Sequence, residues 1–296
     1  MLLVRFPWWR RLFAAARILA TGDNGLYYDH IGGDLLEPEA AIPADSRWLN
    51  LGYWREAQTY PEAAAALARP LAAAAECGPG VHALDCCCGF AAQDFLWLRE
   101  YAGMQITGVN ITASQVEFAR ETAAAANLAD RLELHQASAT ELPFESGSFD
   151  RVVSLESAFH YRPRTQFFAE ASRVLRSGGR LAVLDMLPLP GSPTGGWFRR
   201  LARRYAGIPA ENLVDRDRYA EQLAEAGFRD IRIESIREWV FPGFYRYALA
   251  RRGGTSREMS ITIPAEEVAA SRGSEHWRDE SGLNDYILAT AIAPRK

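Results

Sequence analysis

The stretch Val81–Tyr101 constrains the fold of this chain more than any other part of its sequence. It begins with a short, mostly apolar run that ends at Asp85, and a tight turn of small residues follows over 86–90. Apolar residues then recur at helical spacing over 91–101. A buried strand, a turn and a helix in direct succession predict the first βα unit of a nucleotide-binding α/β sheet. At such a turn the backbone can approach a ligand, and the helix N-terminus offers unpaired N–H groups.

The segments that follow repeat this alternation of strand and helix. We predict strands at 105–109, 132–135, 152–155, 180–185, 231–236 and 285–292, and helices at 62–76 (broken at Pro70), 114–126, 164–175 and 219–226. Ser177–Gly179 predicts the turn from the helix at 164–175 into its strand. Such alternation at short spacing is typical of a parallel sheet with right-handed crossovers.

Composition predicts an ordinary globular protein. Apolar residues make up 48% of the 296 residues and charged residues 24%. The net charge of −4 gives no reason to expect a nucleic acid as partner. Three of the four cysteines are consecutive at 86–88, which is not the C-x-x-C spacing of a zinc site. We therefore expect no metal, and reduced cysteines in a cytoplasmic protein.

The N-terminal segment predicts an amphipathic helix. Trp9, Phe13 and Ala16 share one face, and Arg10 and Arg17 share another. The arginines also interrupt any apolar core of a signal peptide. Such a helix could lie on a membrane surface, or it could cap the pocket of its own chain or of a second copy in a homo-oligomer; we favour the cap.

The chain is expected to consist of four parts. Residues 1–60 would form an N-terminal helical cap or lid, and residues 61–190 the nucleotide-binding core. Residues 191–260, rich in proline, glycine and aromatic residues, would form a substrate-binding insertion. Residues 261–296 would supply a C-terminal helix and the last strand of the core.

Six segments together resemble the Rossmann-like (class I) S-adenosylmethionine (SAM)-dependent methyltransferases. The stretch 81–92 resembles their motif I, D-x-G-x-G-x-G, although only Gly89 is retained and Cys87 and Ala91 replace the other glycines. The remaining segments are Asn50–Trp54, Ile106–Gln115, Ala137–Asp150, Val152–Tyr161 and Phe168–Leu184. The resemblance implies a doubly wound, seven-stranded, mostly parallel α/β sheet with an α-helical substrate cap. The group most similar comprises natural-product enzymes: macrolide-sugar O-methyltransferases, terpenoid C-methyltransferases and relatives of cyclopropane synthases.

The resemblance also implies SAM as the cofactor. Asn110 takes the place of the acidic residue that usually binds the ribose, with Gln115 adding a contact, and Ser138 takes that of the aspartate at the adenine. We expect the backbone of Cys87 to approach the methionyl part of SAM and its thiol to point away. The residues expected to bind the cofactor are Asn50, Tyr53, Asp85, Cys87, Gly89, Asn110, Ile111, Gln115, Ser138, Ala139, Thr140 and Leu155.

Three residues are candidates for catalysis. His160 follows the strand at 152–155 and Asp185 ends the next, so both lie at the ligand-binding edge of the sheet. Methyl transfer to a hydroxyl group requires a base, and in sugar O-methyltransferases of similar sequence a histidine at this place takes the proton. Glu156 or Asp185 could orient His160. Equally, either carboxylate could only cap an element or bind cofactor, and His160 could be a surface histidine.

Two other functions stay open. One is C-methylation of an isoprenoid or another alkene, in which an aromatic wall stabilises a cation and Glu156 takes the proton. The other is a non-enzymatic scaffold whose lost glycines no longer permit SAM binding, although Asp85, Gly89 and Gln115 argue against it. An apolar small-molecule substrate would contact Tyr28, Phe159, Tyr161, Trp197, Trp239, Phe244 and Tyr245, aromatic residues that would otherwise be core.

Overall fold

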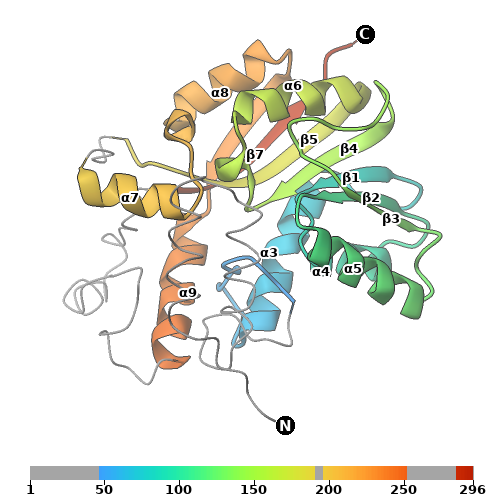
Figure 1. The fold of residues 1–296 in the computed structure, drawn as a ribbon, viewed down its shortest axis with the longest axis horizontal. Helices are drawn as coiled ribbons and strands as arrows, with labels where there is room; N and C mark the ends of the chain where they lie inside the picture. The colour runs from blue at the N-terminus through green and yellow to red at the C-terminus, as the bar shows by residue number, and fades with distance from the viewer. Residues whose placement is uncertain (1–46, 191–195, 252–284, 296) are drawn as a thin grey trace.

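The computed structural model describes residues 47–190, 196–251 and 285–295. These residues form a seven-stranded sheet in the order β3-β2-β1-β4-β5-β7-β6, in which β7 runs antiparallel to β5 and β6 (Figure 1). The strands are β1 (His82–Cys86), β2 (Gln105–Asn110), β3 (Leu132–Gln136), β4 (Phe149–Leu155), β5 (Leu175–Leu187), β6 (Arg229–Ser235) and β7 (Asp285–Ile292). The predicted doubly wound, mostly parallel sheet is confirmed. The predicted N-terminal helix, Tyr28 and residues 261–284 lie outside the described residues.

Helices cover both faces of the sheet (Figure 1). One face packs against α3 (Tyr60–Ala74), α4 (Ala92–Glu100), α5 (Ala113–Ala125) and α9 (Arg237–Arg251). The other packs against α6 (Arg164–Val174) and α8 (Arg216–Glu225). The helix α7 (Trp197–Tyr205) and two 3-10 turns, Ala158–His160 and Ala210–Asn212, belong to the connections at one end of the sheet. Ligand sites in such sheets lie at the carboxyl ends of the parallel strands, where these connections begin.

The helix α3 corrects the expectation of a break at Pro70. It begins with a capping box, because the Thr59 hydroxyl accepts the N–H of Glu62 and the Glu62 carboxylate accepts the N–H of Thr59. It then continues through Pro70 to Ala74. Pro70 removes one helical hydrogen bond, but Leu67 and Leu71 beside it are fully buried against the sheet. Tertiary packing therefore overrides the local preference.

A further expectation is corrected. The predicted turn at Ser177–Gly179 is part of β5, because the backbone bulges there instead of reversing. Gly178 adopts a φ of 73°, and a Cβ on Gly179 would lie 2.9 Å from the carbonyl oxygen of Asp150, so both positions require glycine. The aromatic stretch after β6 forms α9, with Pro242 inside it.

The segment Trp48–Trp54 passes between α3 and α9. The N–H of Tyr53 donates to the carbonyl of Ala63 (2.8 Å), and the N–H of Trp54 donates to that of Trp239 (2.7 Å). A Cβ on Gly243 of α9 would lie only 2.1 Å from the Trp54 side chain, so only glycine permits this contact. Two helices thus hold the segment beside the end of the sheet.

Candidate active site

A cleft lies at the carboxyl ends of β1, β2 and β4. The space between its walls, including the part that is open to solvent, measures about 490 Å³. It is lined by Arg47, Leu49, Asn50, Cys87, Cys88, Gly89, Phe90, Gln93, Asn110, Gln115, Leu155, Glu156 and Ser157. The lining therefore combines the segment before α3, the first βα turn and the ends of β2 and β4.

Many of the residues predicted to bind cofactor meet in this cleft. Its lining includes the predicted Asn50, Cys87, Gly89, Asn110, Gln115 and Leu155, together with Glu156. Asp85 is fully buried behind the cleft and accepts a hydrogen bond of 2.7 Å from Gln93. The other predicted residues lie outside the lining, and their roles stay predictions: Tyr53, Ile111, Ser138, Ala139 and Thr140.

The cleft residues fit a nucleoside joined to an aliphatic chain. Asn110 and Gln115 are bonded to each other (Nδ2 to Oε1, 2.6 Å), so an amide pair stands where the sugar hydroxyl groups are expected. Gly89 adopts a φ of 58°, and a Cβ there would lie 3.1 Å from Leu49 Cδ1. The missing side chain lets backbone line the cleft at its narrow point.

Cys87 adopts a left-handed conformation with a φ of 69°, as does Ala91 with a φ of 60°. The Cys87 thiol donates to Oδ1 of Asn110, 3.6 Å away, and both residues line the cleft. The thiol therefore contacts a residue of the cleft lining, and its orientation relative to the methionyl part of SAM stays a prediction. Burial raises the pKa of the thiol to about 12, so it stays protonated at neutral pH.

Replacing Cys87 with glycine should stabilise the protein by about 1 kcal/mol, because glycine adopts a positive φ without the strain of a Cβ. The midpoint of urea unfolding measures this change, and calorimetric titration with SAM should show binding close to that of the wild type. Ala91→Gly is the matched control, since it relieves the same strain without removing a thiol. A loss of SAM binding in Cys87→Gly alone would mean that the thiol itself holds the ligand.

Behind the cleft, Asp85 and Asp94 form a buried carboxyl pair. Both are fully buried, and Asp85 Oδ1 and both oxygens of Asp94 accept no hydrogen bond from any other described group. Two acceptors without donors can satisfy each other only by sharing a proton. Burial, and then the charge of Asp85, raises the pKa of Asp94 well above its ordinary value.

Asp94→Asn should stabilise the protein at neutral pH by about 1–3 kcal/mol, because the amide donates to Asp85 without needing a shared proton. A carboxyl group with a raised pKa in the folded state stabilises it below the unfolded pKa, and this contribution is lost as pH rises through the folded pKa. Wild type should thus lose more stability than the variant between pH 4 and pH 8 in urea titrations. Parallel pH profiles would contradict the shared proton.

Glu156 begins the connection after β4 and has a φ of 54°. Its Oε2 accepts hydrogen bonds from the N–H of Leu51 (2.9 Å) and the hydroxyl of Tyr286 (2.6 Å). Burial raises its pKa to about 7, despite these two donors. The carboxylate thus lines the cleft and anchors the segment Trp48–Trp54 to the sheet.

His160 is buried at the end of the turn Ala158–His160. Its Nδ1 lies 3.4 Å from the carbonyl oxygen of Gly207. Because a carbonyl can only accept, this contact places a ring proton on Nδ1. The backbone of Ala206 also forms a hydrogen bond with the ring. Burial lowers the pKa of His160 to about 4, so the imidazole is neutral at physiological pH.

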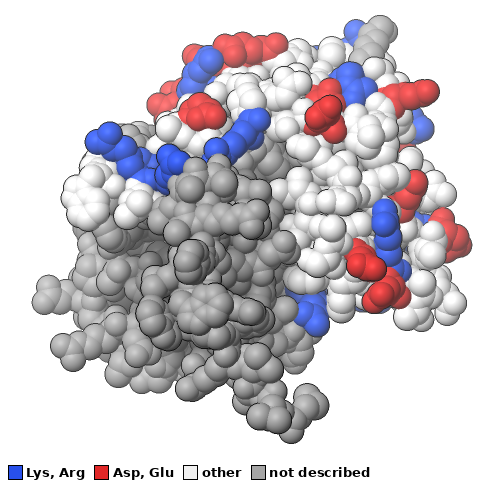
Figure 2. All heavy atoms as spheres, in the orientation of Figure 1, with Lys and Arg blue, Asp and Glu red and all other residues white. Residues whose placement is uncertain are grey.

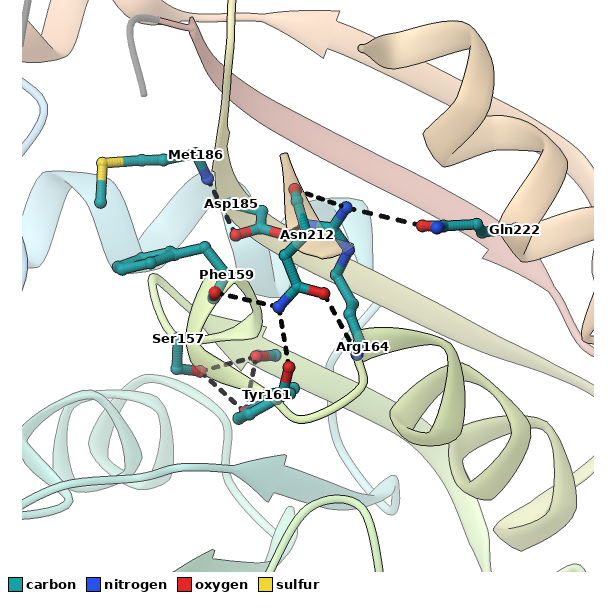
Figure 3. A network of polar contacts seen from close by, with 9 residues as sticks. Ser157, Phe159, Tyr161, Arg164, Asp185, Met186, Asn212 and Gln222 are labelled. Carbon is teal, nitrogen blue, oxygen red and sulfur yellow. Dashed lines mark hydrogen bonds and ion pairs between the residues drawn. The ribbon is translucent and has the colours of Figure 1, made fainter. Parts of the chain in front are cut away.

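The sequence predicts that Asp185 ends its strand, but β5 continues to Leu187. The Asp185 side chain faces Arg164 in a buried network (Figure 3). Its Oδ2 accepts from Arg164 Nη1 (3.3 Å), and its Oδ1 accepts from the N–H of Met186 (2.9 Å). Both side chains of the ion pair are fully buried. The sequence suggested that Asp185 or Glu156 orients His160. In the structure, both oxygens of Asp185 accept hydrogen bonds from other groups, and the Glu156 carboxylate accepts from Leu51 and Tyr286.

The residues predicted to contact substrate are dispersed. Phe159 packs against Ile208, whereas the Tyr161 hydroxyl turns toward the sheet and contacts Ser157 (2.8 Å). On α9, Tyr245 is buried in the main core, with Phe244 packed beside it and Trp239 near Tyr53. These contacts place the rings of Tyr245 and Phe244 with the core, which was the alternative to a substrate wall. A role of the three rings in binding substrate stays a prediction.

The helix α7 carries Trp197, 75% exposed, and Leu201, 44% exposed. Figure 2 shows basic side chains gathered near α7, while the rest of the described surface on this face mixes acidic and basic groups. Among the described helices, none is long and apolar enough to cross a membrane.

Several residues in and around the site were not predicted from the sequence. Arg47 places its guanidinium 4.6 Å from the Phe118 ring and 5.3 Å from that of Phe90, closing one side of the cleft. Gln93 and Ser157 each lie within a few residues of a predicted site residue, and this proximity in the sequence could have indicated them. Arg164 and Asn212 carry no such indication, because their partners lie far apart in the sequence.

Comparisons with known proteins agree with this site. Residues 84–183 match a family model described as a methyltransferase domain. The erythromycin 3''-O-methyltransferase of Saccharopolyspora erythraea is 39% identical over 88% of this chain and 88% of its own length. The 27-O-demethylrifamycin SV methyltransferase of Amycolatopsis mediterranei is 32% identical over 84% of this chain and 92% of its own. The crystal structure of the [4+2]-cyclase SpnF has the same fold, with a TM-score of 0.69 and 23% identity over 92% of this chain and 96% of its own. The chain belongs to the SAM-dependent methyltransferases, in the group whose members act on natural products.

Proposed function

We propose that this enzyme methylates a hydroxyl group of an apolar secondary metabolite, with His160 as the general base. The observation that carries the proposal is the position of His160. Its turn begins directly after the cleft-lining residues Leu155–Ser157, and the Gly207 carbonyl holds its Nδ1. The two relatives, named for O-methylation of erythromycin and of a rifamycin, support a hydroxyl acceptor on a secondary metabolite.

SAM supplies a methyl group bound to a positively charged sulfur atom. On our proposal the amide pair Asn110–Gln115 binds the ribose, and the backbone of Cys87–Gly89 holds the methionyl part. Asn50 borders the same end of the cleft, with its Oδ1 already accepting the N–H of Gly52 (2.9 Å). These residues would hold the cofactor beside the connection after β4.

His160 then removes the proton of the acceptor. As the acceptor oxygen bonds to the methyl carbon and the carbon–sulfur bond breaks, the hydroxyl proton passes to the imidazole of His160. The Nδ1–H remains on the Gly207 carbonyl, which stabilises the imidazolium. The positive charge thus moves from sulfur to imidazole, and the buried site carries the same net charge before and after the step.

The pH dependence separates the two candidate bases. A base must be unprotonated, so activity is lost as pH falls through its pKa. With the pKa of His160 at about 4, kcat/KM should be flat from pH 6 to pH 8 and fall only near pH 4. A fall near pH 7 would match the raised pKa of Glu156 and assign the base to the carboxylate instead.

C-methylation remains the second candidate, because Glu156 lines the cleft and its pKa is raised to about 7. There the carboxylate would take a proton from a cationic intermediate. Acceptor screening with purified protein and SAM tests both functions: transfer to hydroxyl acceptors supports the first, and transfer to alkenes but not to hydroxyl groups supports the second. Failure to bind SAM in calorimetry would contradict both.

A further inference from the structure

Asn212, at the end of the turn Ala210–Asn212, binds the turn that carries His160. Its Nδ2 donates to the carbonyl oxygens of Phe159 (3.0 Å) and Tyr161 (2.7 Å), the two neighbours of His160 (Figure 3). Its Oδ1 accepts the N–H of Arg164 (3.3 Å). Asn212 is 2% exposed, so these bonds are shielded from water. One carboxamide therefore fixes three peptide groups around His160.

Arg164 connects Asn212 to the sheet. Its fully buried guanidinium donates to the backbone carbonyl of Asn212 (Nη2, 3.2 Å) and to Asp185 (Nη1, 3.3 Å). It also lies 4.5 Å from the centre of the Tyr219 ring. Since Asp185 belongs to β5, which lies between β4 and β7, the network connects Asn212 to the interior of the sheet.

The chain just before Asn212 also contacts His160. Gly207 provides the carbonyl that lies beside Nδ1 of His160, and Ile208 packs against Phe159. In the segment Gly207–Asn212, the first residue therefore contacts the imidazole of His160, and the last contacts the backbone on either side of His160. A displacement of Asn212 would move both contacts together.

We propose that Asn212 is a positioning residue that sets the place of the His160 ring relative to the cleft, through the carbonyl groups of Phe159 and Tyr161. On this inference, which rests on the proposed function, Asp185 acts on His160 through Arg164 and Asn212. A carboxamide is required because it donates two hydrogen bonds while accepting a third. A misplacement of about 1 Å at a reacting group can cost about 10²-fold in rate.

Asn212→Asp tests the inference, because the carboxylate has the shape of the amide but cannot donate to either carbonyl. It keeps an acceptor for the N–H of Arg164, and it adds a negative charge near the Arg164 guanidinium, which would attract it. We expect kcat to fall about 10–100-fold, while the Kd for SAM, measured by calorimetry, changes less than about twofold. Asn212→Ser, which retains one donor, should have an intermediate kcat and serves if the aspartate variant does not fold.

Leu132→Ala is the control for a simple loss of stability. Leu132 is buried on β3, several strands from His160, so the variant should have a lower Tm and an unchanged kcat at 25 °C. If Asn212→Asp behaves in the same way, Asn212 is only structural and the inference is overturned.

A double-mutant cycle with His160→Ala separates the inference from the proposed function. If Asn212 acts through His160, adding Asn212→Asp to His160→Ala should lower kcat by less than about twofold more. A further 10–100-fold loss would show that Asn212 acts independently of His160 and would overturn the inference alone. Near wild-type turnover in His160→Ala itself would instead contradict the proposed function.

Discussion

Replacing His160 with alanine is expected to lower turnover by about 10²–10⁴-fold, the usual contribution of a general base. The SAM binding constant should stay within about twofold, because His160 is not part of the described cleft lining. Loss of a buried ring that packs 4.1 Å from the centre of the Phe159 ring will also lower stability. His160→Gln therefore belongs in the same experiment, since it fills the space and keeps a donor for Gly207 without providing a base.

His135→Ala is the matched control. His135 is a partly buried histidine on β3 whose Nε2 lies 2.9 Å from Glu133, and it should have wild-type turnover when replaced. Rates should be measured in single turnovers with saturating SAM, because product release then does not contribute to the rates that are compared. If His160→Ala and His160→Gln retain turnover while Glu156→Gln is inactive, the carboxylate is the base and the acceptor is more consistent with carbon than with oxygen.

Replacing Gly89 with valine is expected to abolish SAM binding, with a loss of at least about 100-fold in affinity. Gly89 has a φ of 58°, which a β-branched residue adopts only under strain. The added Cβ would lie 3.1 Å from Leu49 Cδ1, and the two methyl groups would occupy the narrow part of the cleft. Affinity is measured by calorimetric titration with SAM, alongside circular dichroism to confirm the fold.

Gly147→Val controls for the backbone strain alone. Gly147 has a φ of 73°, and a Cβ there meets no atom within 4 Å. This variant should lose stability much as Gly89→Val does and still bind SAM as wild type. SAM binding by Gly89→Val at wild-type affinity would contradict the assignment of the cleft.

The core of the sheet could be predicted from sequence because its signals are local. The run around Asp85 is apolar over one strand length and is followed by small residues and a helical pattern, so β1 and α4 begin and end close to the predicted residues. Pro70 was misleading for the opposite reason. Its local effect on α3 is outweighed by burial of Leu67 and Leu71, which depends on the assembled sheet.

The site was predictable in part. Cys87, Asn110 and Gln115 occupy motif positions and reach the cleft. The environment of His160 was not predictable, because its partner is the backbone of Gly207, and a carbonyl group has no signature in the sequence. Asn212 was missed for a similar reason: it bonds to backbone groups about fifty positions earlier in the chain.

The wall of the cleft depends on the last strand of the chain. Leu51 donates to Glu156, Glu156 also accepts from Tyr286 on β7, and Trp54 is held by α9. During synthesis on the ribosome, this wall cannot close until nearly the whole chain has emerged. A chimera that joins residues 61–190 to a foreign C-terminal part would therefore inherit the motifs of the cofactor site without its wall. Exchange of substrate caps between such enzymes should preserve α9, β7 and the segment Trp48–Trp54 as one unit.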